Sequence, residues 1–201
     1  WLDLYEDDDD DDDESYNITA SPLTLEQLSE SFAKNVSYFY LKNELGLSDN
    51  ALWRITYEAS SALGMKTDVI RHKINVLKNT MNLTDSQVCK MIEKQPTLLH
   101  LSADRNISPT IFFLLRALDL GREELRELVM AVPSVLTYSL RTLRSKIQFF
   151  TNLLHFSIDE MRELLLNEPR LFRSSVRFGL VPHYKFWTRD VLMPIPEFRS
   201  L

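Results

Sequence analysis

The feature that most constrains this chain is an internal repeat with a period of about 36 residues. Prolines at 96, 133 and 169 each interrupt an apolar helical pattern, which resumes two residues later. Thirteen residues before each proline stands a large apolar residue, and the register extends back to Leu47, where Ser60 replaces a fourth proline. A fixed period of this length is typical of stacked helical repeats that share one continuous core.

Each repeat opens with the signals of a helix N-terminus. A capping residue follows the large apolar position, and Gln87 and Glu160 lie where they complete capping boxes in the second and fourth repeats. Two residues before each cap stand types that include those most tolerant of a left-handed backbone, which predicts a tight turn. The predicted caps are Ser48, Thr84, Gly121 and Ser157, and the predicted turn residues are Gly46, Asn82, Asp119 and His155.

The second half of each repeat carries apolar residues spaced for one helix face. Ile70, Ile74 and Leu77 recur as Ile107, Ile111 and Leu114, and again as Leu143, Ile147 and Phe150. Aromatic residues in these segments could stack on nucleic-acid bases, but their spacing with Ile and Leu favours the core between repeats. These aromatic residues are Phe112, Phe113, Phe149, Phe150 and Trp187.

These patterns predict an all-α chain made of stacked repeats. We expect an acidic, disordered N-terminal arm at 1–21, a helical repeat domain at 22–190 and a C-terminal tail at 191–201. Within the domain we expect a lead helix and four helix–break–helix repeats. Their predicted ranges are 24–44 for the lead helix, then 45–80, 81–117, 118–153 and 154–190.

The distribution of charge is uneven along the chain. The net charge is −6, but residues 1–14 alone carry ten acidic groups and no basic one. Residues 105–201 hold fourteen basic groups, twelve of them Arg, against ten acidic ones. We therefore expect a solubilising acidic arm before a mildly basic body. A sharper hypothesis is that the run Asp7–Asp13 folds back on the basic residues as a phosphate mimic.

Several classes of protein find little support in the sequence. No apolar run approaches the 18 or more residues of a membrane span. Cys89 is the single cysteine, so no internal disulfide forms, which fits a reducing compartment and favours reading the Asn-x-Ser/Thr triplets as chance sequons. The four histidines form no metal-ligand spacing, and no Gly-rich phosphate loop or nucleophile elbow is present. We predict no enzyme activity, no metal and no cofactor.

The combined pattern resembles the mitochondrial transcription termination factor (mTERF) family. It consists of Leu-x-[Leu/Phe]-[Ser/Thr/Gly], an amphipathic helix, Pro-x-[Leu/Val]-[Leu/Phe], and a second helix ending in Phe-Phe or Phe-Trp. The resemblance covers roughly residues 41–190 and is best carried by Leu83–Phe150. It implies α-helix, 3₁₀ turn at the proline and α-helix in each repeat, stacked into a curved superhelix. Ser60 departs from the pattern, and four repeats are fewer than such proteins often have.

The resemblance also implies a mitochondrial or plastid location and nucleic-acid binding. The chain begins at Trp1, as a fragment or processed form would, and shows no targeting peptide. Basic residues recur near the break and the early second helix, where stacking would align them for phosphate contacts. The candidate nucleic-acid-binding residues are Arg71, Lys73, Arg105, Arg141, Arg144, Lys146, Arg173, Arg177, Lys185 and Arg189.

We predict a non-enzymatic protein that binds double-stranded nucleic acid, with DNA favoured over RNA, and that regulates transcription or its termination. One alternative is binding of structured RNA in organellar ribosome assembly, through shape and 2′-hydroxyl contacts. The other is a scaffold that holds a protein partner, with the C-terminal stretch "DVLMPIPEFRSL" as a candidate edge.

Overall fold

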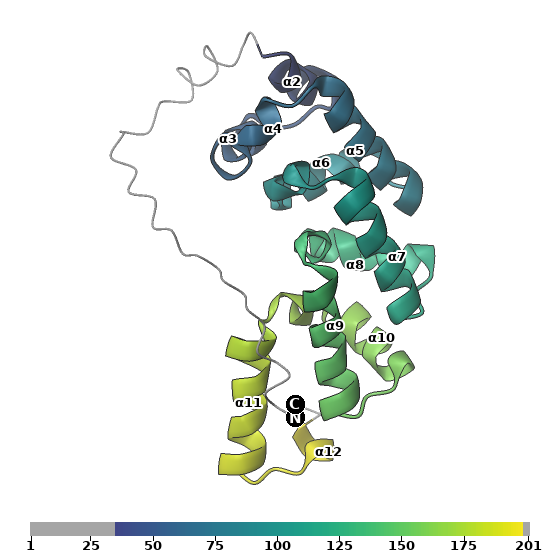
Figure 1. The fold of residues 1–201 in the computed structure, drawn as a ribbon, viewed down its shortest axis with the longest axis vertical. Coiled ribbons are helices and arrows are strands. Elements are labelled where there is room, and N and C mark those ends of the chain that lie inside the picture. Colours follow the sequence, from purple (N-terminus) through teal and green to yellow (C-terminus); the bar gives the residue numbers. More distant parts are fainter. Residues whose placement is uncertain (1–34, 199–201) are drawn as a thin grey trace, which may run out of the picture. The chain divides into compact units, whose positions relative to one another are not determined.

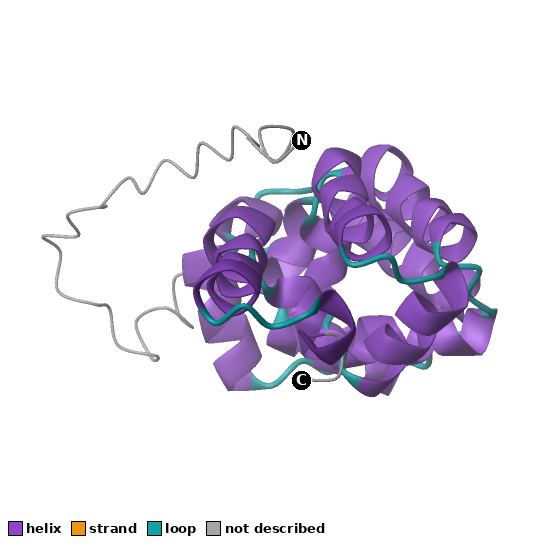
Figure 2. Ribbon diagram, turned by 90° about the horizontal axis from the view of Figure 1, so that it is seen from below, coloured by secondary structure: helices purple, strands orange, loops and turns teal. Residues whose placement is uncertain are grey.

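The computed structural model describes residues 35–198, and within this range every regular element is a helix. Figures 1 and 2 show helices joined by short loops, with no strand among these residues. The predicted all-α class is therefore confirmed for the described part. The acidic arm at 1–21 lies outside it. None of the helices between residues 35 and 198 is long and apolar enough to cross a membrane.

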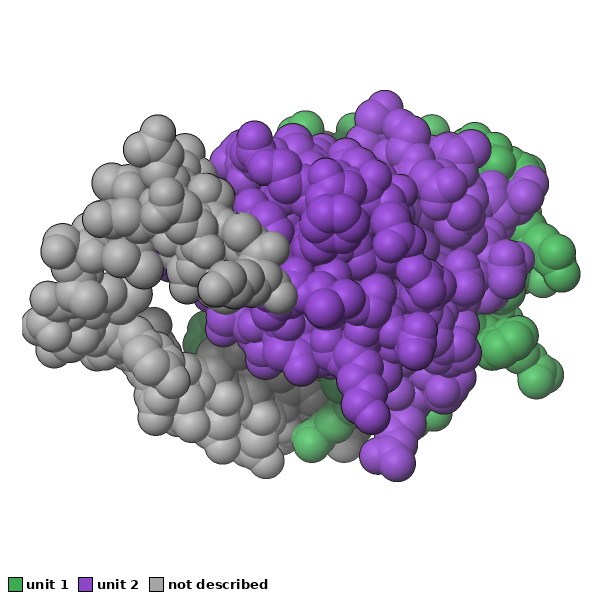
Figure 3. Space-filling view, turned by 90° about the horizontal axis from the view of Figure 1, so that it is seen from above, with its two compact units in different colours: residues 1–8, 109–201 green, residues 9–108 purple. Residues whose placement is uncertain are grey.

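The described residues divide into two compact units, which Figure 3 colours separately. Unit 2 contains residues up to Ser108, and unit 1 contains those from Pro109 onward. The boundary falls inside the predicted repeat 81–117, within one stretch of helix. Each unit is described below by itself.

Unit 2 begins with α2 (Val36–Phe39), which a π-helical turn, η2 (Tyr40–Glu44), continues. Then follow α3 (Asp49–Glu58), α4 (Ser60–Leu63), α5 (Thr67–Met81) and α6 (Asp85–Lys94). The unit closes with the 3₁₀ helix η3 (Pro96–His100) and the π-helical turn η4 (Ala103–Ile107).

Unit 1 begins in α7 (Ser108–Ala117), followed by α8 (Arg122–Ala131), the 3₁₀ helix η5 (Pro133–Thr137) and α9 (Leu140–Gln148). Next come the π-helical turn η6 (Phe149–Leu153), α10 (Ile158–Asn167) and the 3₁₀ helix η7 (Pro169–Arg173). The last elements are η8 (Val176–Leu180), α11 (Val181–Lys185), η9 (Phe186–Asp190) and α12 (Ile195–Phe198).

The turn into each first helix has the predicted left-handed backbone. The φ angles are 80° at Gly46, 52° at Asn82, 48° at Asp119 and 58° at His155. The same geometry returns once more at Leu192, with φ of 60°, just before α12. The segment predicted as a C-terminal tail therefore contains the same turn and the short helix α12.

The predicted helix caps are also confirmed. The hydroxyls of Ser48, Thr84 and Ser157 accept hydrogen bonds from backbone N–H groups in the first turn, at 3.2–3.3 Å. Gly121 has no side chain to do so, but its N–H donates to Glu124 Oε2 at 2.7 Å, which supplies half of a capping box. Each hydroxyl cap satisfies an orphan donor and contributes about 1 kcal/mol to helix stability.

The prolines start 3₁₀ helices, as the family resemblance implies. Pro96, Pro133 and Pro169 each occupy the first position of η3, η5 and η7. The residue before each proline leaves the helical region, with φ between −141° and −125°, because the proline ring excludes α geometry there. In the first repeat Ala59 still breaks the helix at φ −145°, but Ser60 starts the short α-helix α4 instead of a 3₁₀ turn.

The two longer repeats have a π-helical turn at the start of their second helix. The left-handed residues are spaced 36, 37, 36 and 37 apart, and the two longer intervals contain η4 and η8. In η4 the N–H of Ile107 bonds to the carbonyl of Ser102, and in η8 that of Leu180 bonds to Ser175, five residues back. A π turn holds one more residue than an α turn, which matches the longer interval when the turn lies at the start of the second helix. The 36-residue interval from Asp119 to His155 also contains a π turn, η6, but at the end of its second helix.

Proline follows each of these wide turns at the same place, as Pro109 and Pro182. Proline lacks the N–H that would bond to the carbonyl four residues earlier, and its ring crowds that carbonyl. A wider turn before the proline relieves this crowding. The extra residue and the proline therefore belong together in the two longer repeats.

Of the predicted lead helix 24–44, residues 24–34 lie outside the described part of the chain. Asn35 has an extended backbone and caps α2 by accepting from the N–H groups of Ser37 and Tyr38, so the described helix begins at Val36. One prediction about the core is wrong. Phe112, assigned to the core, is 60% exposed. It follows Ile111, which is fully buried, and one residue turns a helix by about 100°, so its ring points away from the core face.

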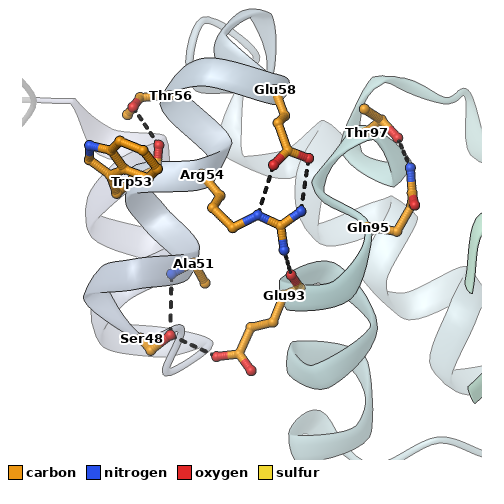
Figure 4. A network of polar contacts seen from close by, with 9 residues as sticks. All are labelled: Ser48, Ala51, Trp53, Arg54, Thr56, Glu58, Glu93, Gln95 and Thr97. Carbon is orange, nitrogen blue, oxygen red and sulfur yellow. Dashed lines mark hydrogen bonds and ion pairs between the residues drawn. The ribbon is translucent and has the colours of Figure 1, made fainter. Parts of the chain in front are cut away.

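The apolar face of the second helices forms the core inside each unit. Leu41 and Leu77 are buried in unit 2, and Leu114, Leu143 and Phe150 are buried in unit 1. First helices are joined by polar contacts as well, and Figure 4 shows the network in unit 2. There Arg54 of α3 pairs with Glu58 through two nitrogens and donates a third bond to the backbone carbonyl of Glu93 in α6.

Candidate nucleic-acid interface

Acidic residues of unit 1 are concentrated on the first helices, which also carry Arg122, Arg126 and Arg162. The first helices α8 and α10 carry six acidic residues between them. In contrast, residues 133–153 hold three basic residues and 169–189 hold five, and neither segment contains an acidic residue. These two segments consist of a 3₁₀ helix and the second helix that follows it. Positive charge is therefore concentrated on the second half of each repeat in unit 1.

One position at the start of the second helices shows this contrast most clearly. The second residue after the helix cap is Asp68 in α5 and Asp104 in η4, but Arg141 in α9 and Arg177 in η8. All four are exposed. The N-terminus of a helix carries partial positive charge, so Asp stabilises it and Arg opposes it. Arg141 and Arg177 therefore oppose the helix dipole at the position where Asp68 and Asp104 match it.

Other exposed basic residues of unit 1 accompany these two. Arg144 lies one turn after Arg141, with its guanidinium 5.7 Å from the centre of the Phe113 ring. Arg173 ends η7, four residues before Arg177, which packs over Phe178 at 5.2 Å. A further exposed residue, Arg170 in η7, was not among the predicted site residues. Its signal was available in the sequence, because it lies in the same segment free of acidic residues.

The profile of the mTERF family matches residues 14–195. The chain belongs to the mTERF family. A comparison with individually curated proteins returned no match. The family match extends over both compact units, and it supports assigning the chain to the organellar repeat proteins that bind nucleic acid.

Two of the predicted contact residues of this mTERF chain are buried. Lys73 is 5% exposed and Lys146 is 4% exposed. The ammonium of Lys73 donates to the backbone carbonyl of Leu99 at 2.5 Å, and that of Lys146 donates to the carbonyl of Ser174 at 2.7 Å. Burial lowers the pKa of Lys73. We remove both from the candidate interface, since neither ammonium can reach a ligand without breaking these bonds.

Arg71 is held by ion pairs and a ring contact inside unit 2 of this mTERF chain. Its guanidinium pairs with Glu44 at 2.9 Å and Asp68 at 3.7 Å and lies over the Tyr40 ring at 4.9 Å. The hydrogen bond to Glu44 raises the pKa of Arg71. Because two carboxylates already neutralise Arg71, it joins α5 to η2 rather than presenting an open positive charge.

The remaining predicted residues are Arg105 in unit 2 and Lys185 and Arg189 in unit 1. Arg105 is exposed in η4, directly after Asp104. Lys185 ends α11 and Arg189 lies in η9, respectively eight and twelve residues after Arg177 in one helical stretch. At about 1.5 Å per residue they lie roughly 12–18 Å further along the helix. Among the candidates of unit 1, Arg173 and Arg177 lie at the start of the last second helix and Lys185 and Arg189 lie further along it. Arg141 and Arg144 lie on α9.

Unit 2 of this mTERF chain has a hollow of about 620 Å³ between the starts of α5 and η4. Asp68, His72, His100 and Asp104 line it, and His72 Nε2 lies 3.4 Å from Asp104 Oδ1. Lys73 lines it as well, and the two carboxylates are those at the second position of α5 and η4. Unit 2 therefore presents acidic side chains at the positions where unit 1 presents Arg.

Side chains with catalytic potential are dispersed among the described residues. Within 35–198 no group of three or more His, Cys, Asp or Glu residues could hold a metal ion. The thiol of Cys89 donates to the carbonyl of Leu45 at 3.0 Å, and burial raises its pKa, which disfavours the reactive thiolate. His183 accepts a hydrogen bond from the Trp187 indole at 2.9 Å.

Proposed function

We propose that this mTERF protein binds duplex DNA through the basic second-half segments of unit 1, in a mitochondrion or plastid, and thereby regulates transcription or its termination. The core of the interface is Arg141, Arg144, Arg173 and Arg177, with Arg170, Lys185 and Arg189 beside them. Arg105 would extend the contacts from unit 2. The protein acts without catalysis or a cofactor.

The observation that carries this proposal is the change from Asp to Arg at the second position of the second helices. Asp68 and Asp104 match the helix dipole, whereas Arg141 and Arg177 oppose it. An anion at these positions is attracted by both the guanidinium and the helix N-terminus, as a phosphate group would be.

The mechanism follows from the chemistry of the duplex backbone. Each guanidinium neutralises a phosphate and releases condensed counterions, which supplies affinity independent of sequence. Phosphate contacts fix the position of the protein along the duplex, and an Arg that reaches a guanine edge in the major groove adds specificity. We further propose that the four repeats at 45–80, 81–117, 118–153 and 154–190 stack into a curved solenoid that aligns these contacts.

Charge reversal at the second position of the second helices, Arg141 and Arg177, tests this function. The variant R141D/R177D copies the residues of unit 2. We expect duplex DNA affinity to fall by about 10- to 100-fold, because two phosphate contacts become repulsive. The free energy of unfolding should stay unchanged or rise by about 0.3–1 kcal/mol per site, because Asp favours the helix N-terminus. Fluorescence anisotropy with a labelled duplex and urea unfolding measure the two quantities.

A matched control separates local contacts from net charge. The variant R116D/R122D makes the same charge change at two exposed residues outside the basic segments. It should retain at least most of the affinity at moderate salt. Equal losses in both variants, or a R141D/R177D protein that is destabilised yet binds normally, would contradict the proposal.

The same titrations distinguish the alternative ligands. Tighter binding to duplex RNA than to duplex DNA would support a role in organellar ribosome assembly. A protein-binding scaffold is the second candidate function, and exposed apolar side chains near the C-terminal end favour it. Phe186, Val191 and Leu192 are 49%, 45% and 79% exposed. Absence of binding to any nucleic acid would favour the scaffold.

A further inference from the structure

A buried polar residue recurs at one position of the second helices. Ser37, Lys73, Thr110 and Lys146 follow one another at intervals of 36, 37 and 36 residues, and all are at most 5% exposed. In three of them the side chain donates to a backbone carbonyl that lies 26 or 28 residues further along the chain, in the next repeat. The acceptors are Met65, Leu99 and Ser174, each shortly before the cap of the next second helix.

Lys146 is the most informative member of this set. Its ammonium lies 2.7 Å from the carbonyl oxygen of Ser174 and 4.9 Å from the centre of the Tyr138 ring. Lysine is rarely buried unless it is paired, because its ammonium loses solvation. Ser37 and Thr110 show that the fold accepts a hydroxyl at this position. A lysine here is therefore not required for packing.

The carbonyl that Lys146 holds lies inside the candidate interface. Ser174 follows Arg173 and stands three residues before Arg177. Ser174 and Ser175 form the short link between η7 and η8, and the hydroxyl of Ser175 caps η8 by accepting from the N–H of Phe178 at 3.2 Å. Fixing the carbonyl of Ser174 fixes the end of one helix and the start of the next, and hence the backbone that carries both arginines.

We propose that Lys146 is a positioning residue of the interface, which acts through the backbone of Ser174 to hold Arg173 and Arg177 in the arrangement that meets two phosphates. This inference rests on the proposed function of those arginines. Lys146 contributes no direct contact to the nucleic acid. Pre-organisation lowers the conformational entropy lost on binding, and that gain is the affinity assigned to Lys146.

A double-mutant cycle tests the proposal. K146M removes the donor but retains the apolar stem. We expect K146M to weaken duplex DNA binding about tenfold in the wild-type background and by less than about twofold in the R173A/R177A background, because interacting residues are non-additive. K73M removes the equivalent buried donor in unit 2 and is the matched control. Its effect should be the same in both backgrounds.

Hydrogen exchange gives a second readout that does not depend on nucleic acid. In K146M the amides of 174–178 should exchange at least about tenfold faster, while those of α8 keep their wild-type protection. If K146M does not fold, K146T provides the test, because Thr110 already occupies this position in the preceding repeat. Both variants are measured in the full chain.

Each outcome decides one of the two claims. Equal losses of affinity in both backgrounds would show a direct or purely structural role and would overturn the inference. Unchanged exchange at 174–178 would overturn it as well. A wild-type chain that binds no nucleic acid would overturn the proposed function, and the exchange measurement would still decide whether Lys146 holds the segment.

Discussion

At the scale of single residues, backbone conformation is the most demanding requirement of the repeat. Gly46, Asn82, Asp119 and His155 were identifiable from the sequence, because few residue types tolerate a left-handed turn and these recur in register. Leu192 was not identifiable, because leucine gives no such signal. The N–H of Met193 donates to the carbonyl of Trp187 at 2.8 Å and closes the turn there.

Substitution of Gly46 tests this requirement. G46A should lower the free energy of unfolding by about 1–2 kcal/mol, because a Cβ is disfavoured at positive φ. A Cβ added there meets no heavy atom within 4 Å, so the cost is backbone strain and not a clash. Gly64 has φ −83° and is the control. G64A should leave stability unchanged or raise it by up to about 1 kcal/mol. Urea unfolding compares the two, and equal effects would contradict the assignment.

The candidate site was only partly predictable at this scale. Charge and spacing identified Arg141, Arg144, Arg173 and Arg177, which are all exposed. They did not identify Lys73 and Lys146 as buried, because a lysine beside an apolar helix position normally extends its ammonium into solvent. Burial requires an acceptor from the next repeat, and that partner lies 26 or 28 residues away in the sequence.

At the scale of elements, the break in each repeat does not depend on proline alone. The helices that precede Pro96, Pro133 and Pro169 end two residues before the proline. Ala59 ends the first helix of the first repeat without one. Packing of the neighbouring segments therefore maintains the break, and proline selects the 3₁₀ form that follows.

Replacement of Pro133 separates these two contributions. P133A should lower the free energy of unfolding by about 1 kcal/mol, because alanine increases the conformational entropy of the unfolded chain. The far-UV circular dichroism spectrum should remain that of the wild type, because the break persists. S60A, at the position without proline, should change stability by less than about 0.5 kcal/mol. A clear gain in helicity for P133A would show that proline alone enforces the break.

The sequence patterns did not predict the π-helical turns η4 and η8. Pro109 and Pro182 were recognised as acceptable near the start of a helix, but the extra residue before each was visible only as a change of interval from 36 to 37. Such a change is equally consistent with a longer loop. The N–H groups of Ile107 and Leu180 bond to carbonyls five residues earlier, which places the extra residue within the helix and not in a loop.

At the scale of the whole molecule, the family and the helical class followed from the repeat, because its caps, turns and prolines agree in register. The division into two compact units did not follow from it, since the repeat pattern runs unbroken across Ser108 and Pro109. Charge distinguishes the two units more than fold does. Unit 1 has segments with basic and no acidic residues, and unit 2 has carboxylates at corresponding positions.

The most direct test of the account is the salt dependence of duplex DNA binding. The wild type should show a steep fall of log affinity with log salt concentration, with a slope of about −0.9 for each phosphate neutralised. R141A/R144A/R173A/R177A should make that slope shallower by up to about 3–4, and R116A/R122A should leave it at the wild-type value. A quadruple variant that keeps both the wild-type slope and the wild-type affinity would contradict the claim that these arginines bind nucleic acid.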